Sequence, residues 1–191
     1  MAALHDVVLV RHGETAWSAS GQHTSYSDIP LTAHGREQAS ALRARLAAWQ
    51  FALVLTSPRQ RARDTCELAG LAGAAQVDDD LAEWDYGEYE GRTMAEIRAQ
   101  DPGWTIFTVD PPGGEIATQV GVRADRVLAR AVAADGPVAL FSHGHFLRVL
   151  GARWVALGVR DGRLLGLDTA TLSVLGHEHD QPVLRVWNSS G

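Results

Sequence analysis

The stretch Val8–Thr15 reads VLVRHGET and carries the strongest structural signal in this sequence of 191 residues. Its apolar half predicts a short buried strand, which ends at an arginine, a histidine and a flexible glycine. Open α/β sheets bind ligands at the carboxyl ends of their strands. The stretch therefore predicts an α/β fold and places Arg11 and His12 where such a fold holds its ligand.

Two later segments repeat this arrangement. Residues Val138–His145 read VALFSHGH, so a second predicted strand also ends in a histidine followed by glycine. Residues Thr56–Thr65 read TSPRQRARDT and follow the apolar run Ala52–Leu55, which places arginines at the start of a predicted helix. One His-Gly pair after a strand usually marks only a turn, but three such strand ends in one chain favour a shared pocket.

The residue types at these strand ends favour a phosphoryl group as the ligand. An arginine guanidinium matches phosphate geometry with two parallel hydrogen bonds. The N-terminus of a helix adds backbone N–H donors and a favourable dipole. Arg59, Arg61 and Arg63 all lie at the start of the middle helix, and the pattern alone does not decide which of them contacts the ligand.

The rest of the chain alternates between predicted strands and helices, which indicates a mostly parallel sheet with helices on both faces. We expect one three-layer αβα sandwich in a single domain of residues 1–191. Strands are expected at 7–10, 52–55, 75–77 and 138–141, followed by an edge hairpin of 171–176 and 183–187. Helices are expected from an N-cap at Thr32 to Trp49, and at 59–69, 94–100, 115–134 and 146–157, with a loop from 13 to 30.

The composition limits the class of partner. A formal net charge of −6 argues against nucleic acid or an anionic membrane, whereas a small anionic molecule fits a local cluster of arginines. No segment approaches the ~20 apolar residues of a membrane span, and no secretory signal is recognised. The one cysteine, Cys66, is expected to be a small buried apolar residue. We expect a cytoplasmic enzyme, and the sequence leaves its oligomeric state open.

Four motifs occur in the order in which a known family carries them. They are Arg11-His12-Gly13-Glu14-Thr15-x-Trp17, Ser57-x-x-x-Arg61-Ala62-x-x-Thr65, Leu81-x-Glu83-x-x-Tyr86-Gly87-x-x-Glu90-Gly91 and Ser142-His143-Gly144. By this ordered set the chain resembles the histidine phosphatase superfamily, the phosphoglycerate-mutase-like proteins, from about Val7 to about Leu157. It is most similar to a phosphatase branch that includes sedoheptulose-1,7-bisphosphatase and acid phosphatases.

The resemblance implies roles for five residues in phosphoryl transfer. His12 matches the nucleophile that forms a phosphohistidine, which water then cleaves. Arg11 and Arg61 match the cations that hold the oxygens of the transferring group. Glu83 matches the general acid that protonates the leaving group and later activates water. His143 matches a second imidazole that donates to a phosphoryl oxygen.

The resemblance also implies substrate contacts, which are Ser18, Thr24, Ser25, Tyr86, Gly144 and His145. Ser18 and Ser25 replace the Asn and the Gly that are usual in the mutases. A mutase carries extra cations for its bisphosphorylated cofactor in the region that corresponds to Gly91–Gly113. This chain has only two arginines and no lysine there. These departures favour hydrolysis over a mutase reaction.

The predicted function is hydrolysis of phosphate monoesters of sugars or small metabolites, without a metal or another cofactor. A sugar bisphosphatase is the sharper hypothesis. A cofactor-dependent phosphoglycerate mutase and an inactive module that only binds phosphate esters are the alternatives. His177 and His179 can share one face of a strand, but no third ligand accompanies them, so no metal site is predicted.

Overall fold

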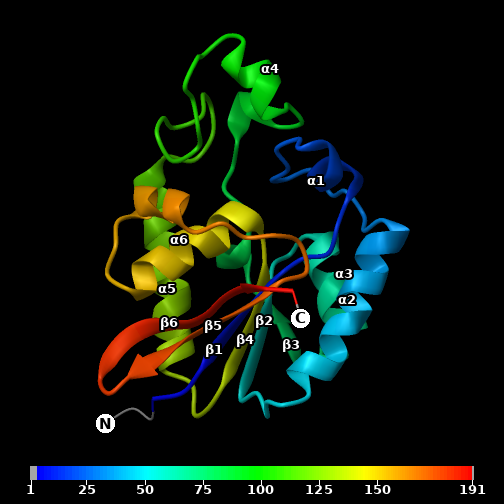
Figure 1. Cartoon of the computed structure of the whole chain (residues 1–191), viewed down its shortest axis with the longest axis vertical. Helices are drawn as coiled ribbons and strands as arrows, with labels where there is room; N and C mark the ends of the chain where they lie inside the picture. Colours follow the sequence, from blue (N-terminus) through cyan, green and yellow to red (C-terminus); the bar gives the residue numbers. More distant parts are fainter. Residues whose placement is uncertain (1–3, 191) are drawn as a thin grey trace.

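Four parallel strands and a C-terminal antiparallel hairpin form one sheet (Figure 1). The computed structural model describes residues 4–190. The order across the sheet is β3-β2-β4-β1-β5-β6, and β5 runs antiparallel to β1. The strands are β1 (Val7–Arg11), β2 (Leu53–Thr56), β3 (Ala75–Val77), β4 (Val138–Ser142), β5 (Leu172–Glu178) and β6 (Gln181–Ser189). The predicted mostly parallel architecture is confirmed.

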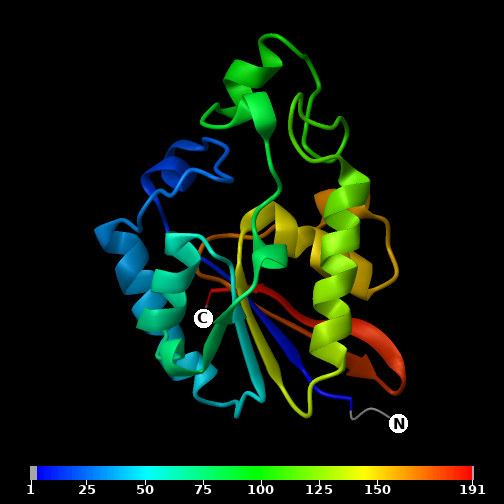
Figure 2. The ribbon, with the colours of Figure 1, turned by 180° about the vertical axis from the view of Figure 1, so that it is seen from behind.

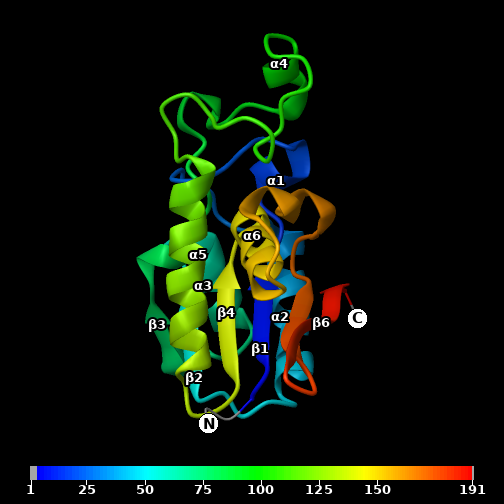
Figure 3. The same cartoon turned by 90° about the vertical axis from the view of Figure 1, so that its left-hand side faces the viewer.

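Different helices cover the two faces of this sheet, as Figures 2 and 3 show from two further directions. Helices α5 (Ala117–Val132) and α6 (Gly144–Trp154) lie on one face, and α2 (Ala33–Leu46) and α3 (Gln60–Leu68) lie on the other. Side chains of β1 alternate between the two buried clusters that result. Because both faces are buried, the strand is a continuous apolar run in the sequence.

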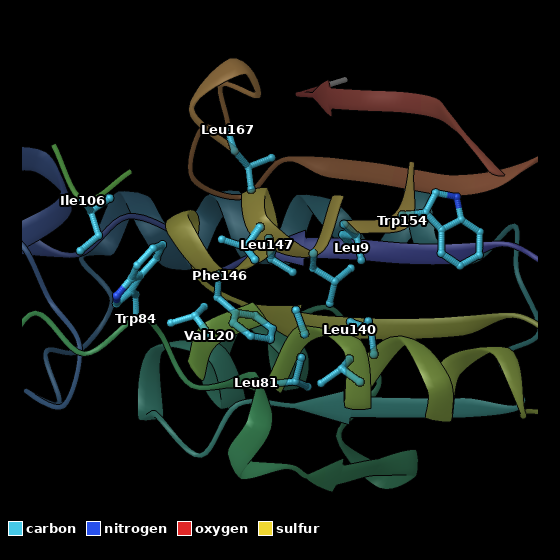
Figure 4. Packing of buried hydrophobic residues seen from close by; sticks show 14 of the residues in the cluster. Leu9, Leu81, Trp84, Ile106, Val120, Leu140, Phe146, Leu147, Trp154 and Leu167 are labelled. Carbon is cyan, nitrogen blue, oxygen red and sulfur yellow. The ribbon is translucent and has the colours of Figure 1, made fainter. Parts of the chain in front are cut away.

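The cluster under α5 and α6 holds the central strands in place (Figure 4). Leu9 of β1 is the register partner of Leu140 of β4, and both are fully buried with Val120 of α5 and Leu147 of α6. The same cluster extends past the end of the sheet to Trp84. Close packing of this kind leaves little freedom for the strand ends, which is what a precise site needs.

The boundaries of two helices matter for the site. Thr32 is the N-cap of α2, as predicted, because its hydroxyl accepts from the Gly35 N–H at 2.9 Å. Helix α2 ends at Leu46, before the predicted end at Trp49. Helix α6 begins at Gly144, two residues earlier than predicted, because the extended backbone of His143 makes that residue the N-cap.

One expectation about the loops is wrong. Residues 13–30 were expected to form only a loop, but they contain the short helix α1 (Ala16–Ser20). Thr15 and Ser18 form a reciprocal capping box there, and Gly21 ends the helix with a left-handed φ of 77°. Five residues are too few to show helical periodicity. The expected edge hairpin is present as β5 and β6, with β5 paired to β1 and β6 at the edge of the sheet.

Residues 88–112, which we call the cap, form an excursion beyond the carboxyl ends of the strands (Figure 1). The cap contains α4 (Met94–Arg98) and is closed at its base, where the Glu88 N–H donates to the Pro112 carbonyl at 2.9 Å. Gly87 makes this closure possible, because its φ is 51° and a Cβ there would lie 2.2 Å from the Pro112 oxygen. The 3-10 turns are η1 (Ala72–Ala74), η2 (Asp79–Leu81), η3 (Gly87–Tyr89) and η4 (Val159–Leu164).

Candidate active site

The carboxyl ends of the central strands meet at one edge of the sheet. The register pairs Arg11 of β1 with Ser142 of β4, and the His12 N–H extends the ladder by donating to the Ser142 carbonyl at 3.0 Å. The rings of His12 and His143 therefore lie side by side, with centroids 5.2 Å apart and planes at 62°. Strand β2 delivers Ser57 to the same edge.

His12 is buried with 6% of its surface exposed. Its Nδ1 lies 2.7 Å from the Gly13 carbonyl, which can only accept, so Nδ1 carries the proton. Burial, followed by the nearby Arg61 and Arg11 cations, holds the pKa of His12 well below its usual value of 6.5. The ring is therefore neutral near pH 7 and presents the lone pair of Nε2 as a nucleophile.

Arg11 lies between the end of β1 and the first turn of α6. One of its terminal nitrogens donates to the Leu167 carbonyl, while its Nε is buried and has no partner among residues 4–190. A Cβ at Gly144 would lie 3.3 Å from the guanidinium carbon, so the glycine lets the helix approach this cation closely. A buried donor without an acceptor is costly, and a bound anion would supply the acceptor.

Arg61 is fully buried and organises the surrounding loops. Its Nη1 donates to the Ser27 carbonyl, and its Nη2 donates to the carbonyls of Thr24 and Ser25. Its Nε donates to Nδ1 of His143 at 3.2 Å. A guanidinium has five N–H groups, so these four bonds leave one N–H, on Nη1, for a ligand.

The bond from Arg61 determines the tautomer of His143. Because Nδ1 accepts, Nε2 must carry the proton, and it donates to the Ser57 hydroxyl at 2.7 Å. Burial, and then Arg61, hold the pKa of His143 well below 6.5, which agrees with a neutral ring. The Nε2–H of His143 can donate to a phosphoryl oxygen only if that oxygen replaces the Ser57 hydroxyl as the acceptor.

Glu83 is anchored at the start of α6. Its carboxylate accepts from the backbone N–H groups of Trp84 (2.9 Å), His145 (3.0 Å) and Phe146 (2.8 Å). These three bonds fix both carboxyl oxygens at the N-terminus of α6, where backbone N–H groups have no partner within the helix. The side chain is 7% exposed and lines the same cavity as His12.

Tyr86 and His145 form a second pair of hydrogen-bonded groups in the cavity. The tyrosine hydroxyl lies 2.6 Å from Nδ1 of His145. Burial and the neighbouring Glu83 carboxylate raise the pKa of Tyr86 well above its usual value of 10. Burial, together with the cation of Arg148, lowers the pKa of His145 well below 6.5. Both groups are therefore uncharged near pH 7.

The structure brings most of the predicted site residues into one cavity of about 170 Å³. Those that line it are Arg11, His12, Ser18, Thr24, Glu83, Tyr86, Gly144 and His145. Arg61 and His143 lie directly behind this wall with no exposed surface. Ser25 is a predicted substrate contact that does not line the cavity. Its hydroxyl instead donates to Glu90 at 2.7 Å.

The site also contains residues that were not predicted. Arg148, His23 and Gln22 line the cavity, and Ser57 holds the proton of His143. Ser57 follows β2 directly, as His12 follows β1, so its position at a strand end was a usable signal. His23 and Arg148 gave no comparable signal, because they reach the cavity from a loop and from the second turn of a helix.

Cys66 is buried in the core, as expected, and burial raises its pKa to about 12. Within residues 4–190, no group of three or more His, Cys, Asp or Glu side chains is placed to hold a metal ion. The same part of the chain contains no helix with the length and apolarity that a membrane crossing requires.

A neutral imidazole with a free lone pair shares one cavity, at the ends of parallel strands, with a buried arginine whose Nε has no partner among residues 4–190. This combination defines an α/β enzyme of phosphoryl transfer. The family model of the histidine phosphatase superfamily (branch 1) matches residues 7–190. The chain belongs to this family. It is a phosphatase, a phosphoric monoester hydrolase.

Relatives with described activities support this assignment. An acid phosphatase of Mycobacterium tuberculosis is 41% identical over 191 residues, which cover 98% of this chain and 94% of the relative. The sedoheptulose 1,7-bisphosphatase of Saccharomyces cerevisiae is 36% identical, with 80% of this chain and 68% of the relative covered.

Solved structures share the fold closely. The structure of an open reading frame of M. tuberculosis has a TM-score of 0.93 and 40% identity, with 98% of this chain and 99% of that chain covered. A mycobacterial glucosyl-3-phosphoglycerate phosphatase in complex with inorganic phosphate has a TM-score of 0.84 and 30% identity, with 97% of each chain covered.

Proposed function

We propose that this phosphatase hydrolyses phosphate monoesters of sugars or small metabolites through a phosphohistidine on His12, without a metal, as one domain in the cytoplasm. The observation that carries the proposal is the pairing of two groups in one cavity. His12, whose Nε2 has a free lone pair, lines the same cavity as Arg11, whose buried Nε has no partner within residues 4–190. A phosphoryl group would occupy the space between a nucleophile and a cation. The cytoplasmic location is supported by a single, buried cysteine.

In the first step, Nε2 of His12 attacks phosphorus. The N–P bond forms while the bond from phosphorus to the leaving oxygen breaks, and Glu83 gives its proton to that oxygen. The glutamate is suited to this role because three backbone N–H groups fix its position in the cavity. The Gly13 carbonyl accepts from Nδ1 and stabilises the positive charge that the ring acquires.

In the second step, water attacks phosphorus and the N–P bond breaks. Glu83 now accepts a proton from the attacking water, and the neutral imidazole of His12 is regenerated. Arg11 and the remaining Nη1–H of Arg61 hold oxygens of the transferring group, and His143 adds a third donor when its Nε2–H leaves the Ser57 hydroxyl.

A bisphosphate substrate is favoured by Arg148. This half-buried arginine lines the cavity outside the group that handles the phosphoryl transfer, and its guanidinium lies 4.5 Å above the ring of Phe107. Its Nε and Nη2 donate to the carbonyls of Gly162 and Arg163, which leaves Nη1 without a partner among the described residues. A second phosphate on the leaving group would find a cation there.

The test is release of inorganic phosphate from a panel of sugar monophosphates, sugar bisphosphates, phosphoglycerates and p-nitrophenyl phosphate, with EDTA present. The His12→Ala variant is the control. We expect release that survives EDTA and disappears in the variant. An acid-labile phosphorylated enzyme, trapped by rapid alkaline quenching, should form in the wild type alone.

Two results would overturn the proposal. Release that EDTA abolishes would contradict a metal-independent reaction. Absence of release from every substrate would leave a phosphoglycerate mutase or a module that only binds phosphate esters. A requirement for 2,3-bisphosphoglycerate with phosphoglycerate as substrate would identify the mutase.

A further inference from the structure

His23 is a buried imidazole in the cavity that the reaction described above does not use. It lines the cavity with 7% of its surface exposed, next to Thr24 and Gln22. Its backbone is tied to the base of the cap by two hydrogen bonds, from His23 N to the Arg92 carbonyl (2.9 Å) and from Gly91 N to the His23 carbonyl (2.8 Å). The residue is therefore held firmly in the wall of the cavity.

The side chain of His23 has one committed nitrogen and one free nitrogen. Nδ1 lies 2.8 Å from the Arg92 carbonyl, and since a carbonyl only accepts, Nδ1 carries the proton. Nε2 is then the acceptor nitrogen of a neutral ring. Among residues 4–190 no group donates to Nε2, and this atom is not sealed from the cavity.

The surroundings of His23 keep this acceptor neutral and in place. Burial lowers the pKa of the ring below 6.5. Tyr86 contacts the ring edge to face, with centroids 4.8 Å apart, and Trp104 of the cap does so at 5.4 Å. His145 stacks on it at 6.1 Å. Ring contacts on several sides leave the imidazole one orientation, so the direction of its lone pair is fixed.

We propose that His23 is a specificity-determining residue, whose Nε2 accepts a hydrogen bond from a hydroxyl of the leaving group and so selects phosphate esters of polyols and sugars. This inference rests on the proposed hydrolysis and identifies the part of the substrate that His23 recognises. A neutral imidazole can accept a hydrogen bond from a hydroxyl group, whereas an aryl or alkyl leaving group has no donor for it. A buried acceptor that is left unpaired by such a substrate also costs free energy.

The experiment compares sugar phosphates with an aryl phosphate in two variants. His23→Phe keeps an aromatic ring in the cavity and removes the acceptor. We expect kcat/KM for fructose 1,6-bisphosphate and ribose 5-phosphate to fall about tenfold, the loss expected for one hydrogen bond. The kcat/KM for p-nitrophenyl phosphate, which has no hydroxyl on its leaving group, should change less than about twofold. His23→Gln, which retains an oxygen acceptor, should recover part of the loss.

The control is His34→Phe, a change at a histidine of α2 whose side chain is 62% exposed, which should leave both substrates unaffected. Equal losses on sugar and aryl phosphates would overturn the inference, as would His23→Gln behaving like His23→Phe, because either result indicates altered packing. A wild type that hydrolyses the aryl phosphate but neither sugar phosphate would overturn it as well, while leaving the phosphatase intact. A wild type inactive on all substrates would instead refute the proposed function.

Discussion

The site contains two regions that are built in different ways. The inner region, at the strand ends, consists of side chains that the sheet itself delivers: His12 follows β1 and His143 follows β4. The outer region is formed where the cap packs against the 22–27 segment, and its residues, such as His23, are held by contacts between loops. The two regions share one cavity.

We therefore expect the inner region to carry out the reaction and the outer region to determine which substrates are preferred. Arg61 of α3 connects the 24–27 loop to His143 through four hydrogen bonds, so a change there disturbs the reacting groups for every substrate. The cap is joined at a narrow base around Gly87, and its Trp104 contacts the ring of His23 in the outer region. Loops on a rigid scaffold can change substrate preference without disturbing catalysis.

The largest expected effect comes from Arg61→Met. The variant removes the donor that fixes His143 and leaves the buried carbonyls of Thr24, Ser25 and Ser27 without this donor. We expect kcat to fall at least about 100-fold on every substrate, as for loss of a preorganised donor. The free energy of unfolding should fall by about 3 kcal/mol or more in urea titrations.

The matched control for that prediction is Arg63→Met on the same helix, where the arginine is exposed. It should leave both kcat and stability nearly unchanged. A loss restricted to sugar phosphates in Arg61→Met would contradict the assignment of this residue to the inner region.

The next effect is on the pH dependence of the inner region. Burial and the Arg61 and Arg11 cations lower the pKa of His12 well below 6.5, and only the neutral ring attacks. Protonation of His12 therefore inhibits the enzyme only at a pH well below 6.5, whereas an unshifted histidine would lose roughly tenfold in neutral fraction one pH unit below its pKa. NMR titration of the His12 ring between about pH 4.5 and 8 measures this directly. A midpoint at or above 6.5 would contradict the expected shift.

A substrate-dependent effect is expected from Arg148→Met in the outer region. The variant removes the cation available to a second phosphate, so kcat/KM for sugar bisphosphates should fall about five- to tenfold. The kcat/KM for monophosphates should stay within about twofold. Arg153→Met, which lies further along α6 and pairs with Asp125, is the control. Equal losses of kcat/KM on monophosphates and bisphosphates would show that Arg148 does not bind a second phosphate.

The smallest effect is expected where Glu90 of the cap is tied to the 22–27 segment. Glu90 accepts from the Ser25 N–H, the Ser25 hydroxyl and the Ser27 N–H. Glu90→Gln weakens these bonds, so we expect KM to rise about threefold and stability to fall by about 1 kcal/mol, with kcat nearly unchanged. Steady-state kinetics and urea unfolding measure both quantities, and the exposed Glu88→Gln is the control. A large fall in kcat would show that the two regions are not separable.

Much of the inner region could be predicted because its signals are local. The apolar runs before His12 and His143 predicted the strands, and their order indicated that both would end at one edge of the sheet. The same local logic found Thr32 as the N-cap of α2 and Cys66 as a core residue. Capping and burial follow from neighbouring residues and from periodicity, which a sequence displays directly.

The outer region could not be predicted in the same way. Ser25 was expected to contact substrate, yet its hydroxyl is bound to Glu90, which lies 65 residues further along the chain. His23 was not singled out, and its free acceptor results from a bond to the Arg92 carbonyl, 69 residues away. Such pairings have no periodicity and no fixed spacing.

The sequence by itself determined the parallel sheet, its two covered faces and the delivery of Arg11, His12 and His143 to one edge. Only the tertiary structure decided which nitrogen of each imidazole is free, which arginine N–H groups remain for a ligand and which loop residues face the cavity. The physical reason is the range of the interactions. Strands and caps are set by nearby residues, whereas a tautomer is set by the one donor or acceptor that folding places within hydrogen-bond distance.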